Sequence, residues 1–494
     1  MVIRETLECI KNGQDIRQSL IELKAGLKDA VGKHALLYQL GNEYDLFYDL
    51  LKHEDAKIRK NTALIMGQLG VPVFLEKLYE AYQKEEQLFV KSSYLTALKE
   101  FDYREYLPEL KGRLECLNQM QVEESNRKHI AEEVRLLSSL ILTMDGVKQH
   151  SFRGYHVPSK VILLTNRNFK HITMDQLKSQ RAKEFNAGIM LKTDDLNEIL
   201  PIRTYQELLF MLEDITICSA DPLVAASLLA KSSLLEFLAI RHKGIPPFYF
   251  RIELKSKMEL SKKSVYTKKL AGELERLTNR QLINTTSNYE IELRLIENKE
   301  GSYNVLLKLY TIKEERFLYR KQVIASSIQP VNAALAAALA KDYLKPDAQI
   351  LDPFCGVGTM LIERHKLLEA NTMYGLDIYG AAINKARENT EEAGLIIHYI
   401  NRDFLDFKHE YLFDEIFTNM PTVRGHKDEQ EVFHLYQQFF VKAKEHLKED
   451  GIMVLYTHNR GFVKKCILPK WYRIEQEYEL SKKEECYLFI IKRI

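Results

Sequence analysis

From residue 324 to the C-terminus, short apolar segments typical of buried strands alternate with longer amphipathic segments typical of helices. The segments that read as strands are 349–352, 372–377, 396–401, 415–419 and 452–458. Strands separated by helices run parallel in one sheet, because each helix carries the chain back before the next strand begins. Two final segments, 472–478 and 485–492, read as a closing antiparallel pair. Residues 322–494 are therefore predicted to form a Rossmann-like α/β domain.

The first 145 residues read instead as amphipathic helices with short turns. Segments 49–70 and 87–101 have related patterns, 32 positions apart when Ile58 is matched to Val90, and a third copy is expected near 130–144. Helix pairs at a fixed period are typical of α-solenoids. Residues 1–148 thus resemble a short run of HEAT-like repeats, which usually present a surface to a protein partner. A plain helical bundle is the alternative.

Residues 149–321 are predicted to form an α+β module. A buried strand is expected at 161–165, and 205–237 looks helical. From residue 248 the pattern changes to alternation, which predicts strands and one basic helix. The strands are expected at 248–254, 289–296 and 303–311, and the helix at 261–277.

Charge is distributed unevenly, although the whole chain carries only +2. Residues 1–150 contain 21 Lys+Arg against 24 Asp+Glu, a balance of −3, and residues 241–325 contain 18 against 10, a balance of +8. A polyanion such as RNA would therefore meet the basic middle of the chain. Within it, Lys262, Lys263, Lys268 and Lys269 are the candidate phosphate contacts. A solvated amphipathic helix is the alternative for these lysines.

The composition excludes several classes of protein. With 46% hydrophobic and 28% charged residues, the chain has the balance of an ordinary globular protein. No stretch approaches the ~18 uncharged apolar residues of a membrane-spanning helix, and the N-terminus does not have the pattern of a signal peptide. The six cysteines are scattered without a CxxC pair, so neither a metal site nor a disulfide framework is expected. A reduced, cytoplasmic protein is the plain interpretation.

A glycine-containing turn follows the first strand of the α/β domain, in the sequence Asp352-Pro-Phe-Cys-Gly-Val-Gly-Thr359. Glycines allow close approach of the backbone to a ligand, and the turn leads into a helix N-terminus. A dinucleotide-binding turn would have a third glycine at position 361, which is Leu361. A carboxylate at Asp352 would also repel a pyrophosphate. S-adenosylmethionine is therefore the favoured cofactor. The residues expected to bind it here are Asp352, Phe354, Gly356, Gly358 and Thr359.

Acidic residues also end the next two strands. Asp377 lies 19 residues beyond Gly358, where a carboxylate can accept both ribose hydroxyls, and Ile378 would pack on the adenine. Asp403 would accept from the adenine amino group, with Phe404 lining the ring. Each acid taken singly is as well explained by a surface turn. Acids at three successive strand ends point to one ligand, because ligands of open α/β sheets bind there.

The fourth strand runs into Asn419-Met-Pro-Thr422. This segment resembles the Asn/Asp-Pro-Pro-aromatic signature of amino-methylating class I methyltransferases. The resemblance implies that Asn419 and Pro421 form the catalytic segment, and that Met420, Thr422 and nearby Arg424 contact the substrate. In that family the Asn side chain and the following carbonyl accept hydrogen bonds from the target amine, and the aromatic residue stacks on a flipped base. The chain departs from the signature at Met420 and Thr422, and the loss of the aromatic puts stacking in question. Asn-x-Pro is otherwise a common turn.

The segment before the α/β domain sharpens this resemblance. Arg316-Phe-Leu-Tyr-Arg320, followed by Ser326, Gln329 and Pro330, resembles the entry into the catalytic domain of THUMP-associated RNA guanine methyltransferases. In that family the arginine segment is a strand, and the second group borders the methionine end of the cofactor. The resemblance implies methylation of a guanine exocyclic amine in tRNA or rRNA. The N-terminal half contains no clear THUMP sequence.

Two alternative functions follow from the same residues. Signatures of the Asn-Pro-Pro-aromatic type also occur in enzymes that methylate protein amides or adenine. Because Thr422 replaces the aromatic residue and the N-terminal helices suggest a binding role, a cofactor-binding pseudo-enzyme that serves as an RNA or protein scaffold is the other alternative.

Overall fold

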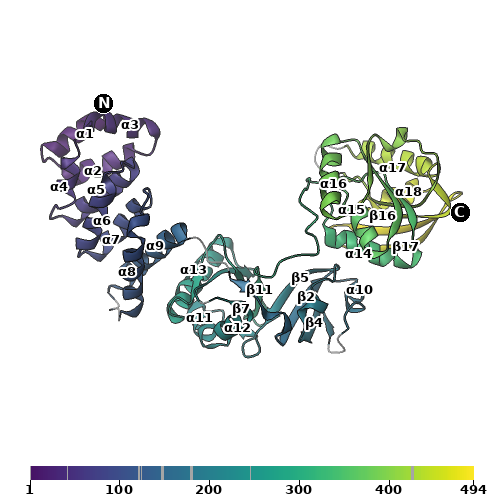
Figure 1. Cartoon of the computed structure of the whole chain (residues 1–494), viewed down its shortest axis with the longest axis horizontal. Coiled ribbons are helices and arrows are strands. Elements are labelled where there is room, and N and C mark those ends of the chain that lie inside the picture. Colours follow the sequence, from purple (N-terminus) through teal and green to yellow (C-terminus); the bar gives the residue numbers. More distant parts are fainter. Residues whose placement is uncertain are drawn as a thin grey trace. The chain divides into compact units, whose positions relative to one another are not determined.

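The structure is a computed structural model of the 494-residue chain (Figure 1). It describes residues 2–41, 43–120, 123, 125–145, 150–178, 182–244, 246–423 and 428–494. Contacts between Cα atoms divide the chain into two compact units, Met1–Gln149 and His150–Ile494.

The first unit is helical throughout its described length. Its elements are α1 (Val2–Lys11), α2 (Ile16–Gly26), α3 (Ala30–Leu40), α4 (Asp45–Leu50), α5 (Ala56–Leu69), α6 (Phe74–Lys84), α7 (Leu88–Leu98), η1 (Arg104–Tyr106), α8 (Leu107–Gln119) and α9 (Arg127–Asp145). Helices α2, α5, α7 and α9 pack on one another in that order. A Cβ on Gly67 of α5 would lie 2.7 Å from the Ala97 Cα atom of α7, so glycine allows this close contact. The predicted helical region is confirmed, and its assignment to HEAT-like repeats stays a prediction.

The first part of the second unit is an α+β module. Its elements are β1 (Ser151–Phe152), η2 (Gly154–His156), β2 (Ser159–Thr165), α10 (Lys170–Met174), β3 (Lys183–Phe185), β4 (Gly188–Thr193), η3 (Leu196–Glu198), β5 (Tyr205–Met211), β6 (Ile217–Cys218), α11 (Pro222–Lys231), α12 (Leu234–Arg241), β7 (His242–Lys243), β8 (Phe248–Lys255), α13 (Leu260–Leu277), β9 (Leu282–Asn284), β10 (Ile291–Glu297) and β11 (Tyr303–Leu309). The main sheet has the order β3-β4-β2-β5-β11-β10-β8-β9, and β6 also pairs with β11.

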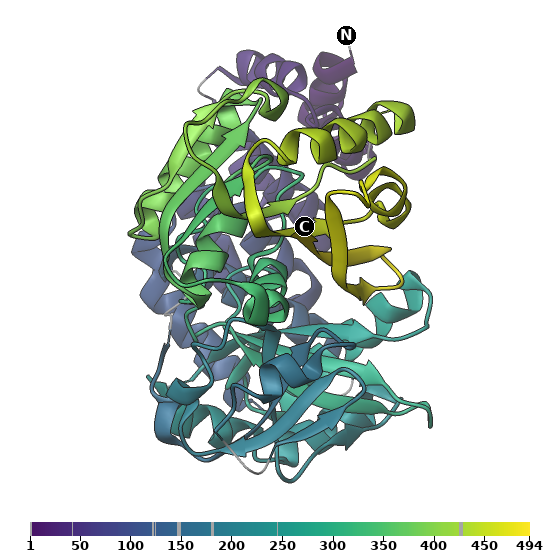
Figure 2. The same ribbon diagram turned by 90° about the vertical axis from the view of Figure 1, so that its right-hand side faces the viewer.

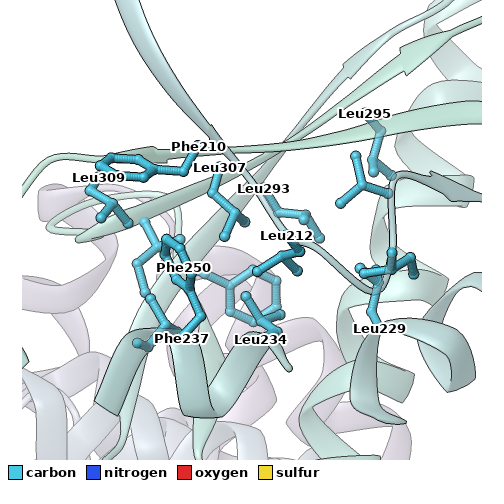
Figure 3. Packing of buried hydrophobic residues seen from close by; sticks show 14 of the residues in the cluster. Phe210, Leu212, Leu229, Leu234, Phe237, Phe250, Leu293, Leu295, Leu307 and Leu309 are labelled. Atoms are coloured by element: carbon cyan, nitrogen blue, oxygen red, sulfur yellow. The ribbon is translucent and has the colours of Figure 1, made fainter. Parts of the chain in front are cut away.

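The core of this module lies between the sheet and helices α11, α12 and α13. Figure 3 shows Phe210, Phe250 and Leu307 from the sheet packed toward Leu234 and Phe237 of α12. In the described part of the chain no single helix is long and apolar enough to cross a membrane. Helices α11 and α12 reach the length and apolar composition of a membrane span only when they are taken together, and the pair is bent by 48° at the break between them.

Residues 205–211 were expected to be helical, and this prediction is wrong. They form strand β5, which pairs with β2 and β11 inside the sheet. The segment Tyr-Gln-Glu-Leu-Leu-Phe-Met has no β-branched residue, and its Gln, Glu, Leu and Met residues are good helix formers. Pairing on both sides overrides that preference.

The remainder of the second unit is the α/β domain. Its elements are α14 (Pro330–Ala340), η4 (Lys341–Tyr343), β12 (Ala348–Asp352), α15 (Thr359–Leu367), β13 (Ala370–Asp377), α16 (Gly380–Glu392), β14 (His398–Asn401), η5 (Phe404–Asp406), β15 (Phe413–Asn419), α17 (Glu429–Ala443), β16 (Leu447–Thr457), α18 (Arg460–Cys466), β17 (Tyr472–Ser481) and β18 (Cys486–Arg493). The sheet order is β14-β13-β12-β15-β16-β18-β17. The first five strands are parallel, and β18 pairs antiparallel with both β16 and β17.

Helices cover both faces of this sheet (Figure 2). Helices α14 and α15 contribute to one buried cluster with strands β12, β13, β16 and β18. Helices α17 and α18 contribute to a second cluster formed with the other side chains of the same strands. The strand order reverses between β12 and β15, which is where such sheets bind ligands, at the carboxyl ends of their strands. The predicted Rossmann-like domain is confirmed.

The segment that joins the module to the α/β domain is a series of turns, so the strand expected at 316–320 is not formed. Its side chains anchor it on both sides. Arg316 donates to the carbonyls of Ile202 and Tyr205 in the module, at 2.9 and 2.8 Å. Tyr319 donates to Glu363 of α15 at 2.6 Å. The side chains of this segment therefore bond to two different domains, which the alternating directions of irregular backbone allow.

A buried ion pair ties α15 to the central strand β15. Arg364 is fully buried and Glu415 is 1% exposed. The guanidinium donates to both carboxylate oxygens, each at 2.8 Å, and to the Lys345 carbonyl at 2.8 Å. Removing one partner would leave the other charge buried without compensation.

We expect Glu415→Gln to lower the free energy of unfolding of the α/β domain by about 3–5 kcal/mol. The single tryptophan, Trp471, lies in this domain, so its fluorescence during urea denaturation reports on it. The control is Glu475→Gln, which removes the pair between Glu475 and the exposed Arg473 and should cost less than about 1 kcal/mol. Equal small losses would contradict a structural role for the buried pair.

Candidate active site

Four parallel strands end at one edge of the α/β sheet, and the predicted site residues follow those ends. Asp352 ends β12, Asp377 ends β13, Asp403 follows β14 and Asn419 ends β15. Because β14, β13, β12 and β15 are neighbours in that order, the sheet brings these residues to one rim. The site residues predicted from the sequence therefore lie along one continuous edge of the sheet.

The turn after β12 depends on glycine at two positions. Gly356 and Gly358 have φ of +53° and +84°, a region that disfavours other residues. A Cβ on Gly358 would lie 2.2 Å from the Tyr399 hydroxyl oxygen, and one on Gly375 would lie 2.7 Å from the Tyr399 ring. Tyr399 donates to or accepts from Thr390 at 2.8 Å, and its burial raises the pKa of its hydroxyl. Tyr399, which the sequence reasoning missed, therefore supports the turn from below.

The Asp377 carboxylate joins two of the strand-end turns. One oxygen accepts from the Gly356 backbone N–H at 3.0 Å, and the other accepts from the Tyr379 backbone N–H at 2.9 Å. Asn401 donates to the Asp377 carbonyl at 2.8 Å. A carboxylate oxygen can accept more than one hydrogen bond, so the group fixed in this way retains capacity to accept from a ligand.

Asp352 is fully buried beneath the same turn. One oxygen accepts from the Thr418 hydroxyl at 2.6 Å and from the Phe354 N–H at 3.1 Å. Burial, with a smaller contribution from the nearby Asp377 charge, raises its pKa to about 7. The second Asp352 oxygen and the Thr359 hydroxyl are buried without a hydrogen-bond partner among the described residues. Buried polar atoms without partners are uncommon in native proteins, so this turn fits a polar ligand.

The residues expected at the methionine end of the cofactor lie beside the turn. A Cβ on Gly356 would lie 3.8 Å from the Ile324 side chain, which places the segment before α14 next to the glycines. Ser326 and Gln329 are exposed, whereas Pro330 is buried as the first residue of α14. Gln329 accepts from Arg320 at 3.3 Å.

The residues expected to surround the adenine divide into two groups. Ile378 is 58% exposed, and so is its neighbour Tyr379 at 60%, an exposed aromatic that the sequence reasoning missed. Asp403 is exposed and caps η5 through the Leu405 N–H. The role given to the Phe404 ring is corrected: the side chain is 1% exposed and packs edge-on to Phe354 at 6.2 Å. Phe404 therefore supports Phe354 from the core and does not line an open surface.

The segment after β15 is fixed through its backbone. The Asn419 side chain makes no hydrogen bond to any residue that the structure describes, so its amide is available to a substrate. Met420 is buried, with its side chain in the core and its N–H donating to the Tyr456 carbonyl at 2.9 Å. The Pro421 carbonyl accepts from the Tyr436 hydroxyl at 3.1 Å and from the Asn459 side chain at 3.2 Å.

A pocket of about 360 Å³ adjoins this segment. Its lining residues follow the ends of β15 and β16, begin α17, lie on α18 or occupy the β17–β18 turn: Thr422, Val423, Glu429, His458, Asn459, Phe462, Glu484 and Glu485. Thr422, which was predicted to contact the substrate, thus lines a concave surface. Arg424, the other predicted substrate contact, lies outside the described residues.

The predicted phosphate contacts lie on α13 of the module. Lys262, Lys268 and Lys269 are exposed, and Lys263 lines an open groove of about 1270 Å³. Tyr266 of the same helix is buried, and its hydroxyl donates to the Ser219 carbonyl at 3.0 Å, so its ring is not available to stack on a base. The described residues contain no group of three or more His, Cys, Asp or Glu side chains arranged to hold a metal ion.

The α/β domain is similar in sequence to known proteins. Residues 320–487 match the family model described as UPF0020, RMKL-like, methyltransferase domain. The chain is 31% identical over 118 residues to tRNA (guanine(10)-N2)-dimethyltransferase from Methanothermobacter thermautotrophicus, which covers 23% of this chain and 33% of that protein. It is 25% identical over 164 residues to carboxy-S-adenosyl-L-methionine synthase from Nautilia profundicola, covering 31% and 66%. The chain thus spans one third and just under two thirds of the length of these relatives.

Solved structures show the same fold. TrmN from Thermus thermophilus superposes with a TM-score of 0.52 at 18% identity, over 68% of this chain and 99% of that chain. A predicted N6-adenine-specific DNA methylase from Listeria monocytogenes gives 0.52 at 16%, over 71% and 97%. SMU.472 complexed with SAH gives 0.52 at 14%, over 68% and 97%. Residues 322–494 are 173 of 494 residues, so the fold likeness extends into the α+β module. These structures confirm the predicted fold, and the family match over residues 320–487 is to a methyltransferase domain.

The raised pKa of Asp352 predicts a specific dependence of stability on pH. Between its ordinary pKa of 3.8 and the folded value of about 7, the unfolded chain has released a proton that the folded chain retains. The free energy of unfolding therefore falls as pH rises through this interval, and it stays lowered above it. Asp352→Asn, which can still accept from Thr418 and Phe354, should escape this loss.

Relative to wild type, we expect Asp352→Asn to gain on the order of 4 kcal/mol between pH 4 and pH 8, from about three pKa units. Urea denaturation followed by Trp471 fluorescence at several pH values measures the difference, and other titrating groups cancel between the two proteins. Parallel pH profiles would show that Asp352 is ionised in the folded protein.

Proposed function

We propose that this protein, whose residues 320–487 match the RMKL-like methyltransferase domain, transfers a methyl group from S-adenosylmethionine to an exocyclic amine of a base in structured RNA. Guanine in tRNA or rRNA is the proposed target. The observation that carries this proposal is the uncommitted amide of Asn419, at the strand end next to the glycine turn. The relative that methylates guanine N2 in tRNA supports the choice of base.

Several residues fit the proposed cofactor. Asp377 would accept from the ribose hydroxyls, and the exposed Ile378 would cover the adenine. The glycine turn, with the buried polar atoms of Asp352 and Thr359, would surround the methionine part. When bound, S-adenosylmethionine supplies an electrophilic methyl group on a positively charged sulfur.

The catalytic work of the chain is then to orient an amine. The Asn419 side-chain oxygen and the Met420 carbonyl would accept the two N–H groups of the target amine, which directs the nitrogen lone pair toward the methyl group. No strong base is required, because the amine loses its proton only after its nitrogen has become positive. The hydrogen bonds from Tyr436 and Asn459 to the Pro421 carbonyl keep this segment rigid.

RNA would reach this domain through the α+β module. The exposed lysines of α13 are proposed to neutralise phosphates, which predicts an affinity that falls with salt concentration. The N-terminal helices are proposed to hold a protein partner, and the protein is proposed to act in the cytoplasm.

The function is tested with the purified full-length chain and tritiated S-adenosylmethionine, offered first total RNA from a strain lacking the gene and then protein extract. Label in RNA that digests to a methylated guanosine supports the proposal. Label only in protein, or only in methylated adenosine, would select the corresponding alternative. Cofactor binding without turnover on any substrate would identify a pseudo-enzyme.

We expect Asp377→Ala to weaken binding of S-adenosylmethionine by on the order of 2–3 kcal/mol, because the ribose hydroxyls would lose a charged acceptor and the turn would lose its link to Gly356. Titration calorimetry measures this change. Asp406→Ala, which removes an exposed carboxylate of η5, serves as the control and should bind normally. Unchanged affinity in Asp377→Ala would remove Asp377 from the site.

We expect Asn419→Ala to bind the cofactor normally and to lower turnover on RNA by roughly 100-fold, the usual cost of losing one hydrogen-bonding group that acts in the transition state. Asn419→Asp should keep part of the activity, since the carboxylate retains an acceptor. If binding and turnover fell together in Asn419→Ala, the residue would be structural.

A further inference from the structure

The pocket beside the catalytic segment is lined by one phenyl ring, that of Phe462, and by the imidazole of His458. Phe462 lies on α18 and is half-buried, so part of its ring is accessible from the pocket. The volume of the pocket, about 360 Å³, falls within the roughly 300–1,000 Å³ of small-molecule pockets. An aromatic surface is therefore available in the pocket that Thr422 lines, although Thr422 itself replaces the aromatic residue of the signature.

The Phe462 ring packs against two aromatic rings of helix α17. Phe433 and Tyr436 of α17 meet it edge-on, with ring centroids 5.1 and 5.6 Å away and interplanar angles of 77° and 82°. Such T-shaped contacts are favourable. They fix the orientation of Phe462 through two residues that do not themselves line the pocket.

The same cluster is bonded to the catalytic segment. Tyr436 is fully buried, and its hydroxyl donates to the Pro421 carbonyl and lies 2.8 Å from the Thr457 hydroxyl. Asn459, at the start of α18, donates to the same carbonyl. Phe462 thus contacts Tyr436, and Tyr436 donates to the carbonyl of Pro421, which lies two residues after Asn419. These two contacts set the position of Phe462 relative to Asn419.

The rim of the pocket is acidic. Glu429, Glu484 and Glu485 are exposed there, and the described lining residues include no lysine or arginine. Carboxylates repel phosphate and accept hydrogen bonds from N–H groups. The rim therefore favours a neutral ring with N–H donors on its edge, such as guanine, over the backbone of a nucleic acid.

We propose that Phe462 supplies the stacking surface for the target base, in place of the aromatic residue that the signature would have at position 422. This inference rests on the proposed function. The base enters between Thr422 and Phe462, stacks on the accessible part of the Phe462 ring, and presents its exocyclic amine to Asn419. A flipped base needs such a surface because it has left the stack of its neighbours.

The experiment compares Phe462→Leu, Phe462→Tyr and Phe433→Leu for methylation of total RNA from a strain lacking the gene. Phe462→Leu should lower kcat/KM by about 5- to 150-fold, the factor that corresponds to ~1–3 kcal/mol per stacked base. Phe462→Tyr keeps a ring and should stay within a few-fold of wild type. Phe433→Leu removes a ring from the same cluster but not from the pocket, and should have a much smaller effect. Affinity for S-adenosylmethionine should be unchanged in all three.

A second-site variant separates stacking from packing. Adding Thr422→Tyr to Phe462→Leu restores an aromatic ring at the position of the signature and should recover activity. Equal losses in Phe462→Leu and Phe433→Leu, or no loss in Phe462→Leu while wild type methylates RNA, would overturn this inference and leave the proposed function intact. A wild-type protein that methylates no RNA would overturn both.

Discussion

Two adjacent buried charges on helix α15 connect the parts of the second unit. Glu363 accepts from Arg203 of the module at 2.6 and 2.7 Å and from Tyr319 of the connecting segment at 2.6 Å. Arg364 pairs with Glu415 on the central strand β15. Buried charges are costly unless they are fully paired, so the helix has few alternative positions. Because α15 begins at the glycine turn, that turn is fixed relative to the catalytic segment after β15 and to the α+β module.

This constraint gives the candidate site its rigidity. The turn is further joined to the end of β13 through Asp377, and Tyr399 occupies the space that two glycines leave open. On the other side of the edge, Tyr436 and Asn459 hold the Pro421 carbonyl. Methyl transfer demands alignment of the acceptor nitrogen with the sulfur–methyl bond, and a rim fixed at both ends provides the positions from which that alignment can be achieved.

Much of this arrangement was predictable from the sequence, for a physical reason. Parallel strands all end at the same edge, so an alternating pattern with polar residues after each strand places Asp352, Asp377 and Asn419 together without knowledge of any contact. Side-chain direction was not predictable in the same way. The ring of Phe404 was expected to line the adenine, and it is buried, because an aromatic residue beside a turn can equally point into the core.

Strand β5 and Phe462 show what local patterns omit. β5 contains no β-branched residue and forms because it pairs on both sides, which depends on segments far away in the chain. Phe462 lies 40 residues after Thr422, and only the folded sheet brings the two to one pocket. The sequence signature therefore shows only that position 422 lacks an aromatic residue. The folded chain places Phe462, which we propose as the replacement, in the same pocket.

The central claim, that this protein methylates guanine in structured RNA, is tested most directly by nucleoside mass spectrometry of tRNA and rRNA from cells with and without the gene. We expect one guanosine methylated on its exocyclic amine to disappear when the gene is removed. It should return when wild-type protein is supplied and stay absent with Asn419→Ala. Identical nucleoside profiles in the two strains would contradict the claim.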